Sequence, residues 1–354
     1  MSSLLHAHSP FRIFAFSALS SLAILIGVIW GVGWEALGIT LVLTVIEVTF
    51  SFENAIVNAK VLANVSKFWQ NIFLSVGIIV AIFGMRILFP IIIVSITADL
   101  SWGQVWDLAL RHPEEYAHYL EAAHPTIAAF GGAFLLMLAL HFFFQDEHKV
   151  LWLERIETHM QKIKHWSGPL LVSVAVILVL AALPANTHAG QTLVAGLLGA
   201  ATYLFIQLLV KWLERFKPGA GANVGKQVGL AAFMTIIYLE ILDASFSFDG
   251  VIGAFAITSD VILIAAGLGI GALWVRSLTV FMVRRGTLKN FVYLEHGAHY
   301  AVLMLAFILL ASVFMDIAEF VPGLIGISII IASILASLQE RHRKRDAYRP
   351  RSHF

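Results

Sequence analysis

The chain has 354 residues, of which 59% are hydrophobic and 13% charged, a composition that excludes an ordinary soluble protein and indicates a polytopic membrane protein. It contains no cysteine, which excludes disulfides and thiolate metal sites and leaves oxygen or imidazole ligands for any bound ion. The formal net charge of +1 identifies no partner, and we expect none among nucleic acids.

Apolar stretches of about 20 residues, the length that crosses ~30 Å of hydrocarbon, recur along the whole chain. We therefore expect an all-α membrane protein with about ten transmembrane helices and the lipid bilayer as its first partner. The first stretch, Ile13 to Trp30, ends without a small-x-small cleavage pattern, so we interpret it as a retained span. In chain order the stretches lie near residues 11–30, 36–63, 70–98, 125–144, 169–184, 191–213, 228–256, 259–283, 291–315 and 321–338.

The loops between these stretches alternate in charge. Every second loop is basic and carries Lys67; Lys149, Arg155, Lys162 and Lys164; Arg215, Lys217 and Lys226; Arg284, Arg285 and Lys289; or the tail "RHRKR". The opposite loops are acidic or neutral. The positive-inside rule then places both termini in the cytoplasm, which requires an even number of spans.

The segment 99–124 is too polar to insert into a bilayer and includes Trp102 and Trp106 among its charges. It is typical of an interfacial helix on the outer surface, and a solvated extracytoplasmic loop is the alternative. On the other side, the charged stretch "LERIETHMQKIKHW" predicts a cytoplasmic surface helix.

Two stretches match without gaps, "EVTFSFENAIVNA" from Glu47 and "DASFSFDGVIGA" from Asp243. The next span of each set holds one arginine, Arg86 or Arg276, and the span after that holds "FGGAFLLMLAL" or "HGAHYAVLMLAF". An offset of five spans makes the second set run opposite to the first, so the pattern predicts two inverted three-helix repeats with a site at their interface.

This pattern divides the chain into five parts. They are an extra N-terminal helix (1–35), the first repeat (36–144), a cytoplasmic loop with two linking helices (145–227), the second repeat (228–315), and a last helix with a basic tail (316–354).

Polar side chains form a stripe along each matched helix. Glu47, Ser51, Asn54 and Asn58 share one face in the first, and Glu240, Asp243 and Ser247 share one in the second. Glu53 and Asp249 lie about 120° away in a regular helix, and a kink at "FSF" would bring them in, with Gly250 favouring a kink in the second repeat.

The five acids Glu47, Glu53, Glu240, Asp243 and Asp249 need a reason to lie in the membrane, because each ionised carboxylate costs ~2.5–3.5 kcal/mol on insertion scales. One interpretation is that they only form structural ion pairs. Lys60, Arg86 and Arg276 nevertheless supply three positive charges and leave two negative charges over. One divalent cation would balance them, and so would coupled protons. Carboxylate and amide oxygens suit Mn²⁺, Mg²⁺ or Ca²⁺.

The motifs "EVTFSFEN", "LEILDASFSFDGVIGAFAIT", "GLGIGALWVRSLTVFMV", "YLEHGAHYA" and "AHPTIAAFGGAFLLM" resemble those of the TerC-like integral membrane proteins of bacteria, in their longer branch of unassigned function. That family is grouped with the LysE-type transporter superfamily, is associated with tellurium resistance and includes members implicated in manganese export. The resemblance implies the bacterial inner membrane, and metal-site positions at Glu47, Glu53, Asn54, Asp243 and Asp249. The chain departs from the family at Glu53, where aspartate is usual, and at Gly250, where asparagine or serine is common.

The histidines have two interpretations. Glu295, His296 and His299 could relay protons or metal, or could pack at the inner interface. His141 with Asp146, Glu147 and His148 could form an ion vestibule, and a solvated loop is the alternative.

A phosphate-binding glycine loop, an HExxH pair and a G-x-S-x-G elbow are missing from the sequence, so we expect neither an enzyme nor an organic cofactor. The favoured function is a transporter that exports a hard divalent cation, with Mn²⁺ as the preferred substrate. The alternatives are a membrane scaffold for envelope stress or tellurium resistance, whose acids are structural, and an intramembrane carboxylate hydrolase.

Overall fold

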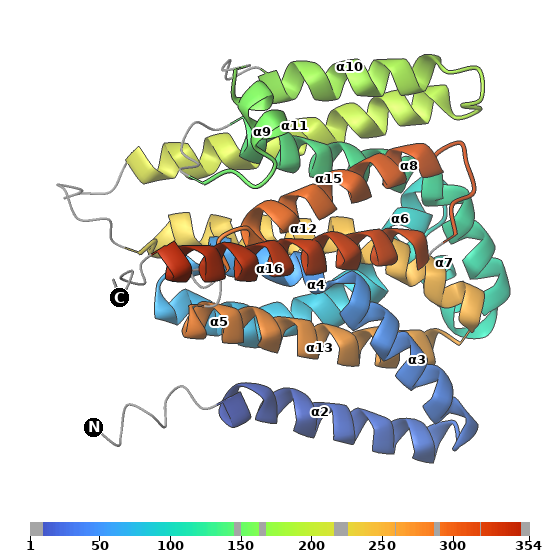
Figure 1. Ribbon diagram of the computed structural model, residues 1–354. Coiled ribbons are helices and arrows are strands. Elements are labelled where there is room, and N and C mark those ends of the chain that lie inside the picture. The colour runs from blue at the N-terminus through green and yellow to red at the C-terminus, as the bar shows by residue number, and fades with distance from the viewer. Residues whose placement is uncertain are drawn as a thin grey trace.

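The computed structural model describes residues 10–144, 150–162, 168–215, 226–258, 260–286, 291–318 and 320–347. These ranges are mainly helical, and their β-type pairing is confined to one bridge between Val65 and Gln227. Figure 1 shows one body of helices that run back and forth, with the start of α2 (Pro10–Gly31) and the end of α16 (Phe320–Ala347) on the same side.

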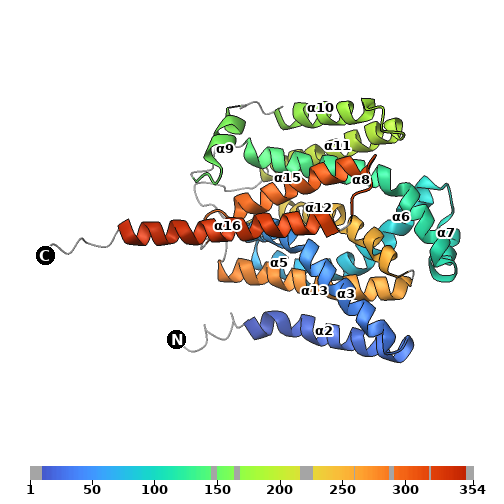
Figure 2. The same ribbon diagram turned by 45° about the vertical axis from the view of Figure 1, so that its right-hand side comes forward.

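The first part of the chain crosses the body in interrupted helices. After α2 come α3 (Glu35–Phe50), α4 (Phe52–Ala63), α5 (Lys67–Ile79), the π-helix η1 (Val80–Leu88) and α6 (Phe89–Thr97). Helix α2 lies at one edge, as Figure 2 also shows, and exposes Phe16, Leu19 and Trp30. An outer helix with exposed apolar side chains is suited to contact lipid.

The middle of the chain supplies the central helix. It consists of α7 (Trp102–Arg111), α8 (Pro113–Phe143), α9 (Glu154–Gln161), α10 (Gly168–Ala182) and α11 (Ala189–Arg215). Residues 131–140 of α8 are all buried, because α11, α12 and α15 pack around this helix. A helix that is apolar all round belongs in such an interior position.

The last part of the chain forms long helices: α12 (Gly229–Ile257), α13 (Val261–Arg285), α15 (Leu294–Ser312) and α16. In the part of the chain that the structure describes, six helices are long and apolar enough to cross a membrane, or seven if α3 and α4 form one bent span. The protein is therefore a multi-pass helical membrane protein. The count of ten spans and the inverted repeats stay predictions.

The predicted interfacial segment 99–124 divides into two different structures. Residues Trp102–Arg111 form α7, which exposes Trp102 and Trp106 and buries Val105 and Ala109, as an amphipathic helix should. From Pro113 onward the chain belongs to α8, which continues through Pro125. The second half of the segment thus extends a long apolar helix.

The expected break at "FSF" occurs in the first matched stretch and not in the second. Helix α3 ends at Phe50, Ser51 has φ −90° and ψ 8°, and the helix axis turns by 55° between residues 35–49 and 54–63. Helix α12 instead runs unbroken from Gly229 to Ile257. The helix is therefore not interrupted at Gly250, where the sequence favoured a break.

Two glycines let α13 pack closely against α3. A Cβ atom added at Gly267 would lie 2.5 Å from Cβ of Leu43, and one added at Gly271 would lie 2.4 Å from Cγ of Glu47. The Thr44 hydroxyl also donates across this contact to the carbonyl of Gly267, at 3.1 Å. Small residues allow such close approach between membrane helices, and here that approach holds Glu47 in place.

We predict that Gly271→Ala destabilises the protein by about 1–3 kcal/mol, because the new methyl group overlaps the Glu47 side chain and the backbone of α3 must shift. Thermal unfolding of the purified protein measures the effect. Gly38→Ala is the matched control, since a Cβ atom there meets nothing within 4 Å. Equal unfolding midpoints in the two variants would contradict the close packing of α3 and α13.

Candidate functional site

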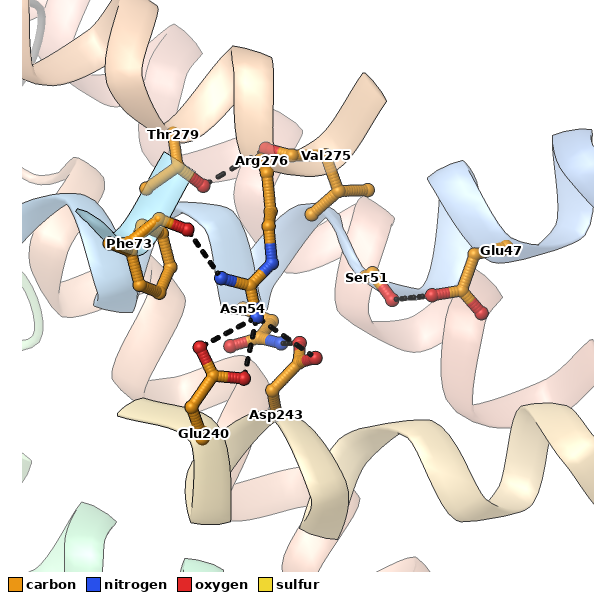
Figure 3. Close-up of polar contacts among 9 residues, drawn as sticks. All are labelled: Glu47, Ser51, Asn54, Phe73, Glu240, Asp243, Val275, Arg276 and Thr279. Atoms are coloured by element: carbon orange, nitrogen blue, oxygen red, sulfur yellow. Dashed lines mark hydrogen bonds and ion pairs between the residues drawn. The ribbon is translucent and has the colours of Figure 1, made fainter. Parts of the chain in front are cut away.

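The centre of the site is Arg276, which α13 places in the interior between α12 and α5. The residue is only 4% exposed. Its Nη2 atom donates to both carboxylate oxygens of Glu240, at 2.9 and 2.7 Å, and its Nη1 atom donates to the carbonyl of Phe73 at 3.0 Å. The guanidinium group also lies 4.2 Å from the centroid of the Phe73 ring. Arg276 therefore ties three helices together and neutralises Glu240 (Figure 3).

Gly77 on α5 makes room for this ion pair. A Cβ atom at that position would lie 2.4 Å from Nη1 of Arg276 and 2.7 Å from Oε1 of Glu240. The sequence does not reveal this role, because a single glycine in an apolar helix has no distinguishing pattern.

Asp243, one turn after Glu240, has a different partner. The side-chain amide of Asn54 donates to Oδ1 of Asp243 at 2.7 Å, which joins α4 to α12. The other oxygen, Oδ2, lies 3.8 Å from Nη2 of Arg276, beyond hydrogen-bond distance. Arg276 thus forms hydrogen bonds to Glu240, and its contact with Asp243 is a longer electrostatic one.

Three buried oxygen atoms beside this pair make no hydrogen bond to any described residue: Oδ2 of Asp243 and the Oδ1 atoms of Asn54 and Asn58. Their residues are 8%, 0% and 3% exposed. A buried acceptor without a partner costs about 1–3 kcal/mol. All three atoms are hard oxygen acceptors of the kind that bind Mn²⁺, Mg²⁺ or Ca²⁺.

Glu47 approaches from α3. It is 2% exposed, and its Oε1 atom accepts a hydrogen bond from the Ser51 hydroxyl at 2.9 Å (Figure 3). A Cβ atom added at Gly250 would lie 3.4 Å from Oε2 of Glu47. Gly250 of the second "FSF" stretch therefore lies against the first acid of the other stretch, so the two matched sequences meet here.

Three of the predicted members have side chains outside the described part of the structure. The positions of Glu53, Arg86 and Asp249 are helical, but their side chains are not described. Among the described side chains, no group of three or more His, Asp or Glu residues is arranged to hold a metal ion. Glu47, Glu240 and Asp243 nevertheless bury three carboxyl groups in the described part of this network, which also contains the guanidinium group of Arg276.

A second polar cluster includes the other predicted residues. Lys60 forms an ion pair with Glu295, and its Nζ atom lies 5.3 Å from the centroid of the Phe142 ring. The His299 ring stacks on the same Phe142 ring, with the ring centroids 3.6 Å apart and an interplanar angle of 8°. Its Nδ1 atom is 2.8 Å from the carbonyl oxygen of Glu295. The packing interpretation of His299 thus has direct support in these contacts.

Helix α9, in the segment between α8 and α10, places Glu157 in this cluster. Glu157 is 2% exposed, and its Oε2 atom lies 3.0 Å from Nδ1 of His296. Burial alone would raise the pKa of Glu157, but the hydrogen bond with His296 and those from the backbone of Leu153 and Trp152 hold it below its usual value. Glu157 is therefore an anion at neutral pH that anchors α9 to α15.

Glu157 is not among the predicted site residues, although the sequence contains a signal for it. Leu153, Glu157 and Met160 share one face of the predicted surface helix, and an acid between two apolar residues on such a face indicates a buried contact. The vestibule proposed from Asp146, Glu147 and His148 lies outside the described residues. His141 lies within the described residues, and the centroid of its ring is 5.9 Å from the centroid of the Tyr203 ring.

The fold and the site define a multi-pass helical membrane protein with a buried network of acids, amides and one arginine. The chain belongs to a family described as "Protein of unknown function (DUF475)", whose model matches residues 52–344. The matched range contains Asn54, Glu240, Asp243 and Arg276. Comparison with curated proteins and with solved structures returns no match.

We predict that Arg276→Leu lowers the free energy of unfolding by about 3–5 kcal/mol, because it leaves Glu240 buried without its cation. Thermal or denaturant unfolding of the purified variant measures the loss. Arg284→Leu is the matched control, since Arg284 lies near the end of the same helix, is exposed and makes only a 3.5 Å contact with Asn71. Similar stability of both variants would show that the Arg276 pair does not hold α12, α13 and α5 together.

Proposed function

We propose that this protein is a membrane transporter that moves a hard divalent cation, preferably Mn²⁺, outward across the membrane. The observation that carries the proposal is that Oδ2 of Asp243 and the amide oxygens of Asn54 and Asn58 are buried without a hydrogen bond to a described residue, while the nearby Arg276 is already engaged by Glu240. A divalent cation would supply the missing partner for these oxygens and would offset the surplus negative charge.

In this proposal the acids have different roles. Glu240 is the fixed counter-ion of Arg276, because both of its oxygens are engaged. Asp243 and Asn54 are ligands from α12 and α4, and Glu47 adds a carboxylate from α3. Glu53 and Asp249 complete the set by their places in the matched motifs, as the resemblance to TerC-like proteins implies.

The break between α3 and α4 supports a transport site. Helix ends inside a membrane leave carbonyl oxygens that can bind cations, and interrupted helices mark the substrate sites of many transporters. Here the break at Ser51 lies one turn from Glu47 and one turn from Asn54. The π-helix η1 on the neighbouring segment is a second irregularity of the kind that is frequent at functional sites.

A scaffold with structural acids is the second candidate, and the bidentate Arg276–Glu240 pair favours it. Such a protein needs no cation, so metal binding at Asp243 distinguishes the two functions. The outward direction and the preference for Mn²⁺ follow the resemblance to manganese exporters.

We predict that Asp243→Asn and Asp249→Asn each weaken Mn²⁺ binding at least about tenfold, which is about 1.4 kcal/mol, because each removes one anionic ligand while keeping its size. Titration calorimetry on the purified protein measures the affinity. Binding should also weaken as the pH falls, since the ligands must be deprotonated.

Asp107→Asn on the exposed helix α7 is the control and should bind like the wild type, because Asp107 pairs only with Arg111 at the surface. Equal affinity in wild type, Asp243→Asn and Asp249→Asn would sink the transporter proposal. So would the absence of binding in all three with Mn²⁺, Mg²⁺ and Ca²⁺.

A further inference from the structure

A cavity of about 340 Å³ with both polar and apolar walls lies between α4, α8, α11, α12 and α15. Its wall includes Asn64, His141, Gln207, Gln227, Thr235 and His299. The cavity residues lie at the end of α4, near the end of α8 and at the start of α12. Figure 1 shows the start of α12 on the same side of the body as α9, the start of α2 and the end of α16. The charge alternation of the loops predicts that this end faces the cytoplasm.

The cavity begins close to the Asp243 network. On α4, Asn58 follows Asn54 by one turn, and the cavity residues Val61 and Asn64 follow Asn58 at intervals of three residues. On α12, the cavity residue Thr235 precedes Asp243 by about two turns. Asn58 therefore stands between the network and the cavity along α4.

The side chain of Asn58 has the properties of a ligand for an ion in passage. The residue is 3% exposed, and its Oδ1 atom has no hydrogen-bond partner among the described residues. A neutral amide oxygen can replace part of a cation's hydration shell, but it does not hold the ion as a carboxylate does. Conduction requires such sites, which are favourable enough to enter and weak enough to leave.

Lys60 lies in the cavity wall, and its charge would repel a cation. The ion pair with Glu295 and the contact with the Phe142 ring offset that charge and hold it against α8 and α15. The Lys60–Glu295 pair thus makes the wall compatible with the passage of a cation.

We infer that this cavity is the cytoplasmic access path of a divalent cation to Asp243, that Asn58 is a transit ligand along it, and that Glu295 keeps the charge of Lys60 from closing it. The inference rests on the proposed function and adds the side from which the site is reached.

The absence of cysteine from the sequence allows a direct test with single-cysteine variants. Asn64→Cys and Gln207→Cys should react with a membrane-impermeant maleimide in inside-out membrane vesicles and not in right-side-out vesicles. Ser312→Cys is the control, because Ser312 lines a separate cavity of about 340 Å³ together with His124 and Asp316, and it should react only from the opposite side. Reaction of Asn64→Cys from the outside, or from neither side, overturns the inference.

Asn58→Cys links the cavity to the metal. It should react slowly and only from the cytoplasmic side, and Mn²⁺ at ten times its Kd should slow the reaction about tenfold, since about one molecule in ten stays metal-free. Labelling of Asn64→Cys should change far less. An Asn58→Cys reaction that Mn²⁺ leaves unchanged, although calorimetry shows binding that depends on Asp243, overturns the access path and leaves the proposed function standing.

The charge of Lys60 is tested separately by initial rates of Mn²⁺ uptake into inside-out vesicles. Glu295→Gln should slow uptake by roughly tenfold, and the double variant Glu295→Gln with Lys60→Met should restore it, while both keep the equilibrium affinity. Failure of the second change to restore uptake overturns the role of this pair. If neither the wild type nor any variant binds metal, the proposed function fails. Labelling of Asn64→Cys then still shows the side of the membrane to which the cavity opens.

Discussion

The structure depends on a buried arginine that can fully satisfy one carboxylate but not two. Arg276 gives hydrogen bonds to both oxygens of Glu240 and to the carbonyl of Phe73, so its donors are directed to α12 and α5. Asp243 lies on the same helix face, yet its Oδ2 atom remains 3.8 Å away. Breaking the pair would strand a buried charge, which costs far more than an exposed pair contributes. The geometry of Arg276 thus determines that the charge of Glu240 is compensated by hydrogen bonds, and that Oδ2 of Asp243 is left without a hydrogen bond and can bind another partner.

Close helix packing brings the rest of the network to this pair. Gly77 lets α5 approach Arg276, and Gly271 lets α13 approach Glu47. At both positions a Cβ atom would overlap the neighbouring side chain, so a glycine is needed. The two matched stretches contribute unequally. The first is broken at Ser51 and followed by the π-helix η1, whereas α12 and α13 are continuous. A continuous half that holds Glu240, Asp243 and Arg276 and an interrupted half that supplies Glu47 and the amide of Asn54 suit a site that must bind and release an ion.

The sequence predicted the helical membrane fold and the meeting of Asn54, Glu240, Asp243 and Arg276, because charges in apolar helices are too costly to be left unpaired. It could not predict which acid Arg276 selects, since that depends on distances of a few tenths of an ångström between helices remote in the sequence.

Two local expectations failed for physical reasons. Pro125 does not begin its helix, because α8 continues through it with α11, α12 and α15 packed around the helix. Helix α12 is not interrupted at Gly250, and this glycine lies against Glu47 of α3.

The most direct measurement of the central claim is an anomalous-scattering map from crystals grown with Mn²⁺. The account predicts a peak between α4 and α12, about 2–2.6 Å from Oδ2 of Asp243 and Oδ1 of Asn54, with Arg276 still paired to Glu240. A map with no peak at these atoms, or with a peak only in the cavity beside His124 and Asp316, would contradict it.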